Sequence, residues 1–132
     1  MHRVVQVITM LFFLFILWII VSADTNKQTI FFEIIGSIPN GDKVGHFFLF
    51  GMLTLLLNFA LKFKSINLWQ KLPLGTVLVS VFVLLEELSQ VFFPNRTLDI
   101  ADLIADGLGI LIFTFVGYYW FENNLFSLKA FD

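Results

Sequence analysis

The chain has 132 residues, of which 58% are hydrophobic and 14% are charged, and its formal net charge is −2. Soluble domains are about 45–50% apolar and about 25% charged, so this composition excludes an ordinary soluble domain. It predicts an integral membrane protein that is embedded in the lipid bilayer. The weak net charge offers no basic surface for nucleic acid, and the absence of cysteine excludes disulfide bonds, thiolate catalysis and cysteine metal sites.

The first apolar segment covers residues 4–22 and follows a short basic start formed by His2 and Arg3. At about 1.5 Å per residue it is long enough to cross a hydrocarbon core of about 30 Å, so we predict a transmembrane helix. A cleaved signal peptide is the alternative, because residues 21–23 read Val-Ser-Ala and resemble a cleavage site. The apolar run exceeds the usual signal core of about 7–15 residues, which favours a retained helix.

The connection that follows, residues 24–43, is the first loop. Within it, residues 30–38 are apolar enough to lie along the membrane surface as an interfacial helix, and an irregular loop is the alternative. Residues 38–41 read Ile-Pro-Asn-Gly, which is a turn sequence. Asp42 is placed to cap the next transmembrane helix, predicted over residues 43–61.

Two further transmembrane helices are predicted over residues 73–93 and 98–121. Lys62, Lys64 and Lys71 share the loop between the second and third helices, and no acid lies near them in the sequence. The positive-inside tendency therefore places this loop and both chain termini in the cytoplasm.

The predicted fold is all-α, a compact bundle of four transmembrane helices that forms a single membrane domain over residues 1–132. Ala101, Ala105 and Gly109 recur every four residues on the last helix. Small residues at this spacing let two helices approach closely, which favours tight packing of the bundle.

Polar residues gather where the predicted helices meet the outer side of the membrane. Asp42 and His46 are four residues apart and Glu87 and Gln90 are three apart, so each pair shares one helix face. The last helix opens with three regularly spaced acids, Asp99, Asp102 and Asp106. A carboxylate at the centre of a membrane helix costs about 2.5–3.5 kcal/mol on insertion scales, so acids are seldom kept there without a function. These acids therefore predict a functional polar cluster that faces outward.

A structural network is the alternative to a functional site. In that case Arg96 and Lys43 each pair with a carboxylate. Asp42 and Asp99 then simply cap helices, and the cluster holds the bundle together. Against this interpretation, the acids at positions 86, 87, 99, 102 and 106 outnumber the two cations. Some of these acids must therefore be protonated, solvated, or bound to a cation or a ligand.

A divalent cation held by His46 and neighbouring acids is a candidate by ligand type, and no other cofactor is predicted. The sequence has no HExxH-type spacing, nucleophilic triad, phosphate loop or dinucleotide fingerprint, so the metal ligands are left open. A proton or ion carrier is disfavoured, because the inner halves of the predicted helices lack acids.

Three motifs resemble those of the VanZ-like family, in that family's order and spacing over residues 38–117. Residues 42–47 read DKVGHF and are similar to the family's DKxxHF start. Residues 87–97 read ELSQVFFPNRT and resemble its ExxQxF-x-PxR segment. Residues 99–109 follow its DxxDxxxD/N-x-x-G run.

The resemblance implies a protein of the bacterial cytoplasmic membrane, in a family whose name is linked to resistance against teicoplanin-type glycopeptides. These antibiotics bind cell-wall precursors outside the membrane, which is the side predicted for the polar cluster. The family supplies no agreed reaction, so whether the chain is an enzyme stays open. Asn95 and Asp106 depart from the Gly and Asn that many relatives carry, and Asp106 adds an acid to the cluster.

We therefore hypothesise that the chain binds or acts on a lipid-linked or cell-envelope component and affects glycopeptide susceptibility. His46, Glu87 and Asp102 are the candidate catalytic residues, for proton transfer or cation binding. The candidate ligand-binding residues are Asp42, Lys43, Gln90, Arg96, Asp99 and Asp106, among which the two cations suit an anionic phosphate or carboxylate. A non-enzymatic accessory or scaffold protein is the alternative, and the sequence leaves the ligand and the oligomeric state open.

Overall fold

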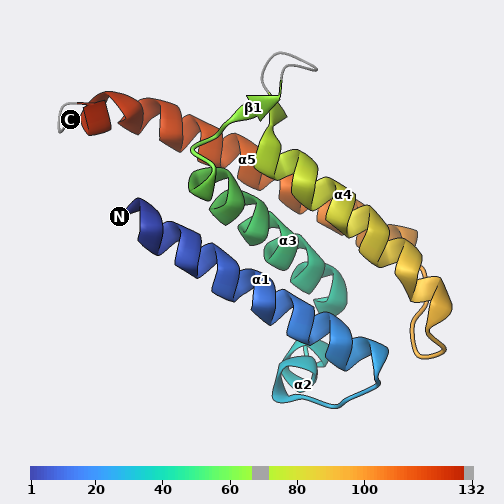
Figure 1. Cartoon of the computed structure of the whole chain (residues 1–132). Helices are drawn as coiled ribbons and strands as arrows, with labels where there is room; N and C mark the ends of the chain where they lie inside the picture. The colour runs from blue at the N-terminus through green and yellow to red at the C-terminus, as the bar shows by residue number, and fades with distance from the viewer. Residues whose placement is uncertain (67–71, 130–132) are drawn as a thin grey trace.

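The computed structural model describes residues 1–66 and 72–129, and the chain is almost entirely helical there (Figure 1). The helices are α1 (His2–Asp24), α2 (Ile30–Gly36), α3 (Gly41–Ala60), α4 (Leu74–Ser89) and α5 (Ile100–Lys129), and the 3-10 turn η2 (Gln90–Phe92) continues α4. Two short antiparallel strands, β1 (Ser65–Ile66) and β2 (Leu72–Pro73), join α3 to α4, with Ser65 opposite Pro73 and Ile66 opposite Leu72.

Four of the described helices are long and apolar enough to cross a membrane, namely α1, α3, α4 with η2, and α5. The prediction of an all-α bundle with four membrane spans is therefore confirmed. Successive spans alternate in direction, so the start of α1 and the end of α5 lie at one end of the bundle and α2 lies at the other (Figure 1). The loop between η2 and α5 is at the same end as α2. Which end faces the cytoplasm remains a prediction.

The central helix is α3, which contacts α1, α2, α4 and α5 and packs most extensively against α5. Glycines explain how close α3 and α5 come. A Cβ added at Gly109 would collide with the backbone carbonyl of Phe47, and one added at Gly51 would meet the ring of Phe113. Of the small-residue triplet predicted on the last helix, Gly109 lies in this contact, whereas Ala101 is exposed.

The hydrophobic core lies between the four spans and takes residues from each: Ile16, Phe50, Leu53, Val79, Val83 and Ile110. Around this core the outer helix faces remain apolar, as a bundle surrounded by lipid requires. On α1, for example, Val4, Leu11 and Trp18 recur on one exposed face. The opposite face of α1 packs on α3, where the Thr9 hydroxyl donates to the Leu56 carbonyl at 3.2 Å.

The observed helix bounds differ from the predicted ones by a few residues at most ends, and most at the end of the last span. The last span was predicted to end at residue 121, but α5 continues to Lys129, because the polar residues 122–124 extend the helix beyond the apolar stretch instead of ending it. The predicted interfacial segment over residues 30–38 contains a helix, α2, whose start is capped by the Thr29 side chain. Lys71, which the sequence placed in the basic loop, lies outside the described residues.

The prediction that Asp42 caps a helix is wrong. α3 begins at Gly41, after Asn40 turns the chain with a left-handed backbone (φ 53°), so Asp42 is already in the first helical turn. Its carboxylate instead accepts a hydrogen bond from the Lys43 ammonium at 2.9 Å.

Candidate functional site

The predicted site residues all lie at the end of the bundle that carries α2, which we call the acidic end. There α1 ends, α3 begins, α4 ends in η2, and α5 begins. Helices that alternate in direction bring these four helix ends together, although their residues are far apart in the sequence. The polar side chains at the acidic end form three adjoining groups, each around one basic residue.

The Lys43 group consists of Lys43, Asp42, Asp99 and Asp102. The Lys43 ammonium lies 2.9 Å from Asp42, 3.3 Å from Asp99 and 3.3 Å from Asp102, and its side chain is about one-third exposed. Asp99 also accepts a hydrogen bond from the Ala101 backbone N–H at 2.8 Å, so the predicted cap at the start of α5 is confirmed. The Ala101 N–H, together with the Lys43 ammonium, holds the pKa of Asp99 below its usual value.

The His46 group consists of His46, Glu87 and Asp106, and it is the most buried of the three. His46 Nδ1 lies 2.8 Å from Asp106 Oδ1 and 4.0 Å from Glu87 Oε1. The side chains of Glu87 and Asp106 are only 1% and 0% exposed. On the other ring nitrogen, Nε2 lies 3.9 Å from Asp102 Oδ2, which joins the His46 group to the Lys43 group.

The Arg96 group consists of Arg96, Asp24 and Glu86. The guanidinium donates one hydrogen bond to Asp24 at 2.8 Å and another to Glu86 at 3.2 Å. Gln90 joins this group to the His46 group, because its amide nitrogen donates to both Glu86 (3.1 Å) and Glu87 (3.2 Å). All nine predicted site residues thus belong to one continuous series of polar contacts.

Two acids of the Arg96 group were not among the predicted site residues, Glu86 and Asp24. Glu86 was expected only as one of the excess acids of the cluster. Asp24 ends α1 and was expected only as the start of the first loop. The sequence could have indicated Asp24, because it is the first acid after the first span. It therefore lies at the same end of the predicted bundle as Arg96.

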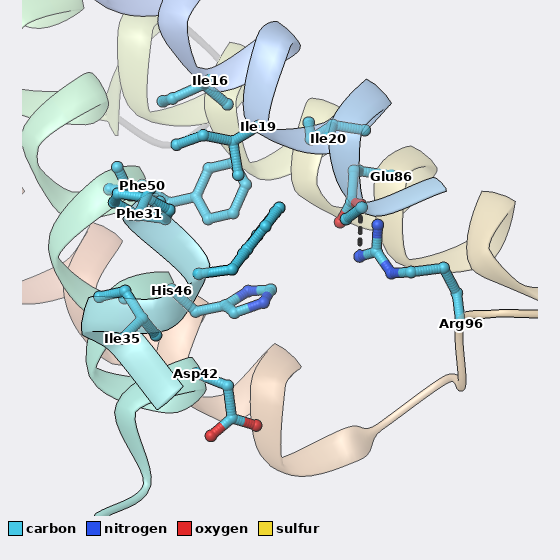
Figure 2. A pocket seen from close by; sticks show the side chains of 14 residues that line it. Ile16, Ile19, Ile20, Phe31, Ile35, Asp42, His46, Phe50, Glu86 and Arg96 are labelled. Carbon is cyan, nitrogen blue, oxygen red and sulfur yellow. Dashed lines mark hydrogen bonds and ion pairs between the residues drawn. The ribbon is translucent and has the colours of Figure 1, made fainter. Parts of the chain in front are cut away.

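A cleft of about 130 Å³ opens beside the His46 and Arg96 groups (Figure 2). One wall is apolar and comes mainly from α1 and α2, with Ile16, Ile19, Ile20, Phe31 and Ile35 among its residues. His46 points into the middle of the view, with Glu86 and Arg96 on one side and Asp42 below (Figure 2). The cleft therefore combines an apolar wall with acidic and basic groups, a combination that suits an amphiphilic ligand.

A second buried polar cluster lies away from the acidic end and was also missed. The Asn58 amide donates to the Thr76 hydroxyl at 2.9 Å, and the Thr76 backbone N–H donates to the Asn58 carbonyl oxygen at 3.1 Å. The Thr76 and Thr114 hydroxyls are 2.8 Å apart. These mutual hydrogen bonds tie α3, α4 and α5 together, which is a structural role.

Comparison with known proteins gives one positive result. The family model described as VanZ/LLP1 matches residues 3–122, which adds the first span to the motif-bearing region 38–117. Searches of curated proteins and of solved structures found no match. The family match covers most of the chain, and four described helices can span a membrane. The chain is thus a multi-pass membrane protein that belongs to the VanZ/LLP1 family.

Proposed function

We propose that the chain binds the head group of a lipid-linked cell-envelope component in the cleft at the acidic end. The observation that carries this proposal is the pairing of an apolar wall, from α1 and α2, with the polar groups of His46, Glu86 and Arg96. A lipid chain in contact with the wall would place its head group beside these three side chains. Small-ligand sites combine apolar walls with a few placed polar groups in the same way.

The orientation of the bundle is part of the proposal. Lys62 and Lys64 lie at the opposite end from the cleft, where the positive-inside tendency favours the cytoplasm. The acidic end would then face outward from a bacterial cytoplasmic membrane, the side on which glycopeptides bind cell-wall precursors. A protein that binds such a precursor, or alters access to it, would change susceptibility to teicoplanin.

The predicted residue roles fit the cleft to different degrees. Arg96 and His46 line it, so they are the groups that would meet an anionic phosphate or carboxylate. Lys43 contacts three acids and Arg96 contacts two, so an anion added at either cation would have to compete with them. Glu87 and Asp102, on either side of His46, are the proposed partners for proton transfer or cation binding. A divalent cation bound here would attract the same anionic head group.

A pocket-filling variant tests the proposal without removing any polar contact. Gly45 lines the cleft, and a Cβ added there would meet only Ile35 at an ordinary 3.9 Å, so Gly45→Leu should fold and obstruct the cleft. Gly107→Leu is the matched control, because nothing lies within 4 Å of a Cβ at that exposed position.

The readout is teicoplanin susceptibility of a host that expresses each protein at equal membrane abundance. We expect protection from the wild type and from Gly107→Leu, and loss of protection with Gly45→Leu and Glu87→Gln. Equal protection by all four proteins would contradict a role for the cleft. No protection by the wild type would separate this chain from the glycopeptide phenotype.

A purely structural role is the second candidate, because Lys43, His46 and Arg96 each already contact acids of the described chain. On this view the protein is a non-enzymatic accessory or scaffold subunit. Stability in detergent separates the two candidates. Glu87→Gln and Asp102→Asn should strongly lower the melting temperature if the cluster only holds helices together, and should leave it nearly unchanged if the cluster is a working site.

A further inference from the structure

We propose that His46, Glu87 and Asp106 bind one divalent transition-metal ion of the Mn²⁺ or Zn²⁺ class. This ion would lie beside the cleft of the proposed function. The inference rests on that function only for the role of the ion in binding a head group. Binding of the ion can be measured with no lipid ligand present.

The first observation is a pair of buried carboxylate oxygens without a partner. Glu87 Oε2 and Asp106 Oδ2 are inaccessible and accept no hydrogen bond from any residue that the structure describes. Their side chains are at least 99% buried. An unsatisfied buried polar atom costs about 1–3 kcal/mol, and more if it is charged, so two adjacent ones point to a missing partner.

The second observation is the spacing of the ligand atoms. His46, Glu87 and Asp106 each offer one such atom, and these atoms all lie within 4.8 Å of one another. Two ligands that each lie about 2.0–2.2 Å from one ion are at most about 4.4 Å apart. His46 Nδ1 lies 2.8 Å from Asp106 Oδ1, in a hydrogen bond that an ion would replace, and 4.0 Å from Glu87 Oε1. Both carboxylates therefore lie within reach of one ion bound at Nδ1, with small adjustments of the side chains.

The surroundings support the ligands as an outer shell would. Gln90 donates to Glu87 Oε1 at 3.2 Å, which fixes the carboxylate and leaves Oε2 free. Asp102 Oδ2 lies 3.9 Å from His46 Nε2, beyond hydrogen-bond distance, so it places a negative charge beside the second ring nitrogen. Histidines that bind metals generally donate that second N–H to a carboxylate, carbonyl or water, and Asp102 is the nearest carboxylate to Nε2 in the described chain.

A second group has suitable spacing for a metal ion and consists of three acids, Asp42, Asp99 and Asp102. The charges nearby favour the His46 group over this second group. In that second group the Lys43 ammonium already contacts every acid and would repel a metal ion. Glu87 and Asp106 have only His46 as a basic neighbour within 4 Å in the described chain. A dication would neutralise both carboxylates in a region from which water is excluded.

The donor set indicates the class of ion. Imidazole suits Zn²⁺ and other later transition metals, whereas carboxylates suit Mn²⁺, Mg²⁺ and Ca²⁺. One nitrogen with two carboxylates therefore favours Zn²⁺ or Mn²⁺ over the hard alkaline-earth ions. Three protein ligands also leave a coordination position open, as in metal sites that bind a further oxygen ligand.

The test uses the full chain in a neutral detergent, stripped with a chelator and titrated with Mn²⁺ while the free-ion resonance is followed by electron paramagnetic resonance. We expect about one bound Mn²⁺ per chain, displaced by Zn²⁺, with a coupling to imidazole nitrogen. Glu87→Gln and Asp106→Asn remove a direct ligand. Each should weaken binding by more than the roughly 10–100-fold that loss of an outer-shell partner costs.

Asp99→Asn is the matched control, because it removes an acid from the Lys43 group while asparagine can still cap α5. It should bind Mn²⁺ as the wild type does. Absence of a site in the wild type, or loss of binding in Asp99→Asn alone, would overturn the proposal. If Asp106→Asn fails to fold, the imidazole coupling in the wild type and its loss in His46→Gln decide the question. Metal binding without any lipid binding would refute the proposed function and leave this inference standing.

Discussion

Arg96 sits in a loop, yet it connects the end of α1 to the end of α4 through Asp24 and Glu86. Both acids are largely buried, with side chains 12% and 4% exposed. Removal of the guanidinium would leave them without their cation, and breaking a buried pair in this way costs about 3–5 kcal/mol. Arg96 thus links the ends of α1 and α4 to the loop that precedes α5.

Arg96→Ala should therefore lower the free energy of unfolding by about 3–5 kcal/mol, measured by reversible unfolding in detergent micelles. Arg96→Lys should recover only part of that loss, because an ammonium has no planar fork to reach both acids. The control is Lys64→Ala, an exposed residue at the opposite end, which should change stability by less than about 0.5 kcal/mol. Equal stability of Arg96→Ala and the wild type would show that these ion pairs contribute nothing.

The sequence predicted which polar residues come together at the acidic end, but it did not predict which acid each basic residue contacts. Helical spacing was sufficient to place Asp42 with His46, and Glu87 with Gln90, on shared faces. Pairing depends on how neighbouring helices rotate against each other, which spacing within one helix does not determine. Arg96 consequently meets Asp24, an acid that the sequence analysis did not count in the cluster.

Among the elements, the contact between α3 and α5 is the most extensive, and it positions His46 against Asp106. The contact is close because Gly109 has no side chain where it meets the Phe47 backbone. Any Cβ at this position must push α5 away from α3. The small-residue spacing indicated this contact, although only its last member lies at the closest point.

Gly109→Ala should destabilise the protein by about 1–3 kcal/mol, the usual cost of overpacking. Gly107→Ala is the control two residues away, with nothing within 4 Å of the added Cβ, and it should be neutral or slightly stabilising. Both are measured by thermal unfolding in the same detergent. Greater loss in Gly107→Ala than in Gly109→Ala would contradict the described helix contact.

Helix existence could be predicted from apolar length alone, while helix ends could not. Asp42 has the right chemistry for a cap, but the left-handed turn at Asn40 starts α3 at Gly41, two residues earlier than a cap at Asp42 allows. Likewise, residues 122–124 are polar but remain compatible with a helix, so α5 continues past the end of the apolar stretch. Local backbone geometry decided both ends.

For the whole molecule, the proposed orientation gives a clean labelling experiment because the chain contains no cysteine. Single cysteines at Asn26 and Thr97, at the acidic end, should react with a membrane-impermeant thiol reagent added to intact cells. A cysteine at Lys62 should react only after the membrane is opened, since the basic loop is predicted to be cytoplasmic. The reverse pattern would place the cleft inside the cell and remove its access to external precursors.

The cleft at the acidic end is proposed to bind a lipid-linked anionic head group. The most direct measurement is native mass spectrometry of the purified chain with an added polyprenyl phosphate, with the phosphate-free polyprenol as the ligand control. We predict a bound polyprenyl phosphate on the wild type and on Gly107→Leu. With Gly45→Leu, and with the polyprenol, binding should be at least about tenfold weaker, which is about 1.4 kcal/mol. Equal binding of polyprenyl phosphate to all three proteins, or none to the wild type, would contradict the claim.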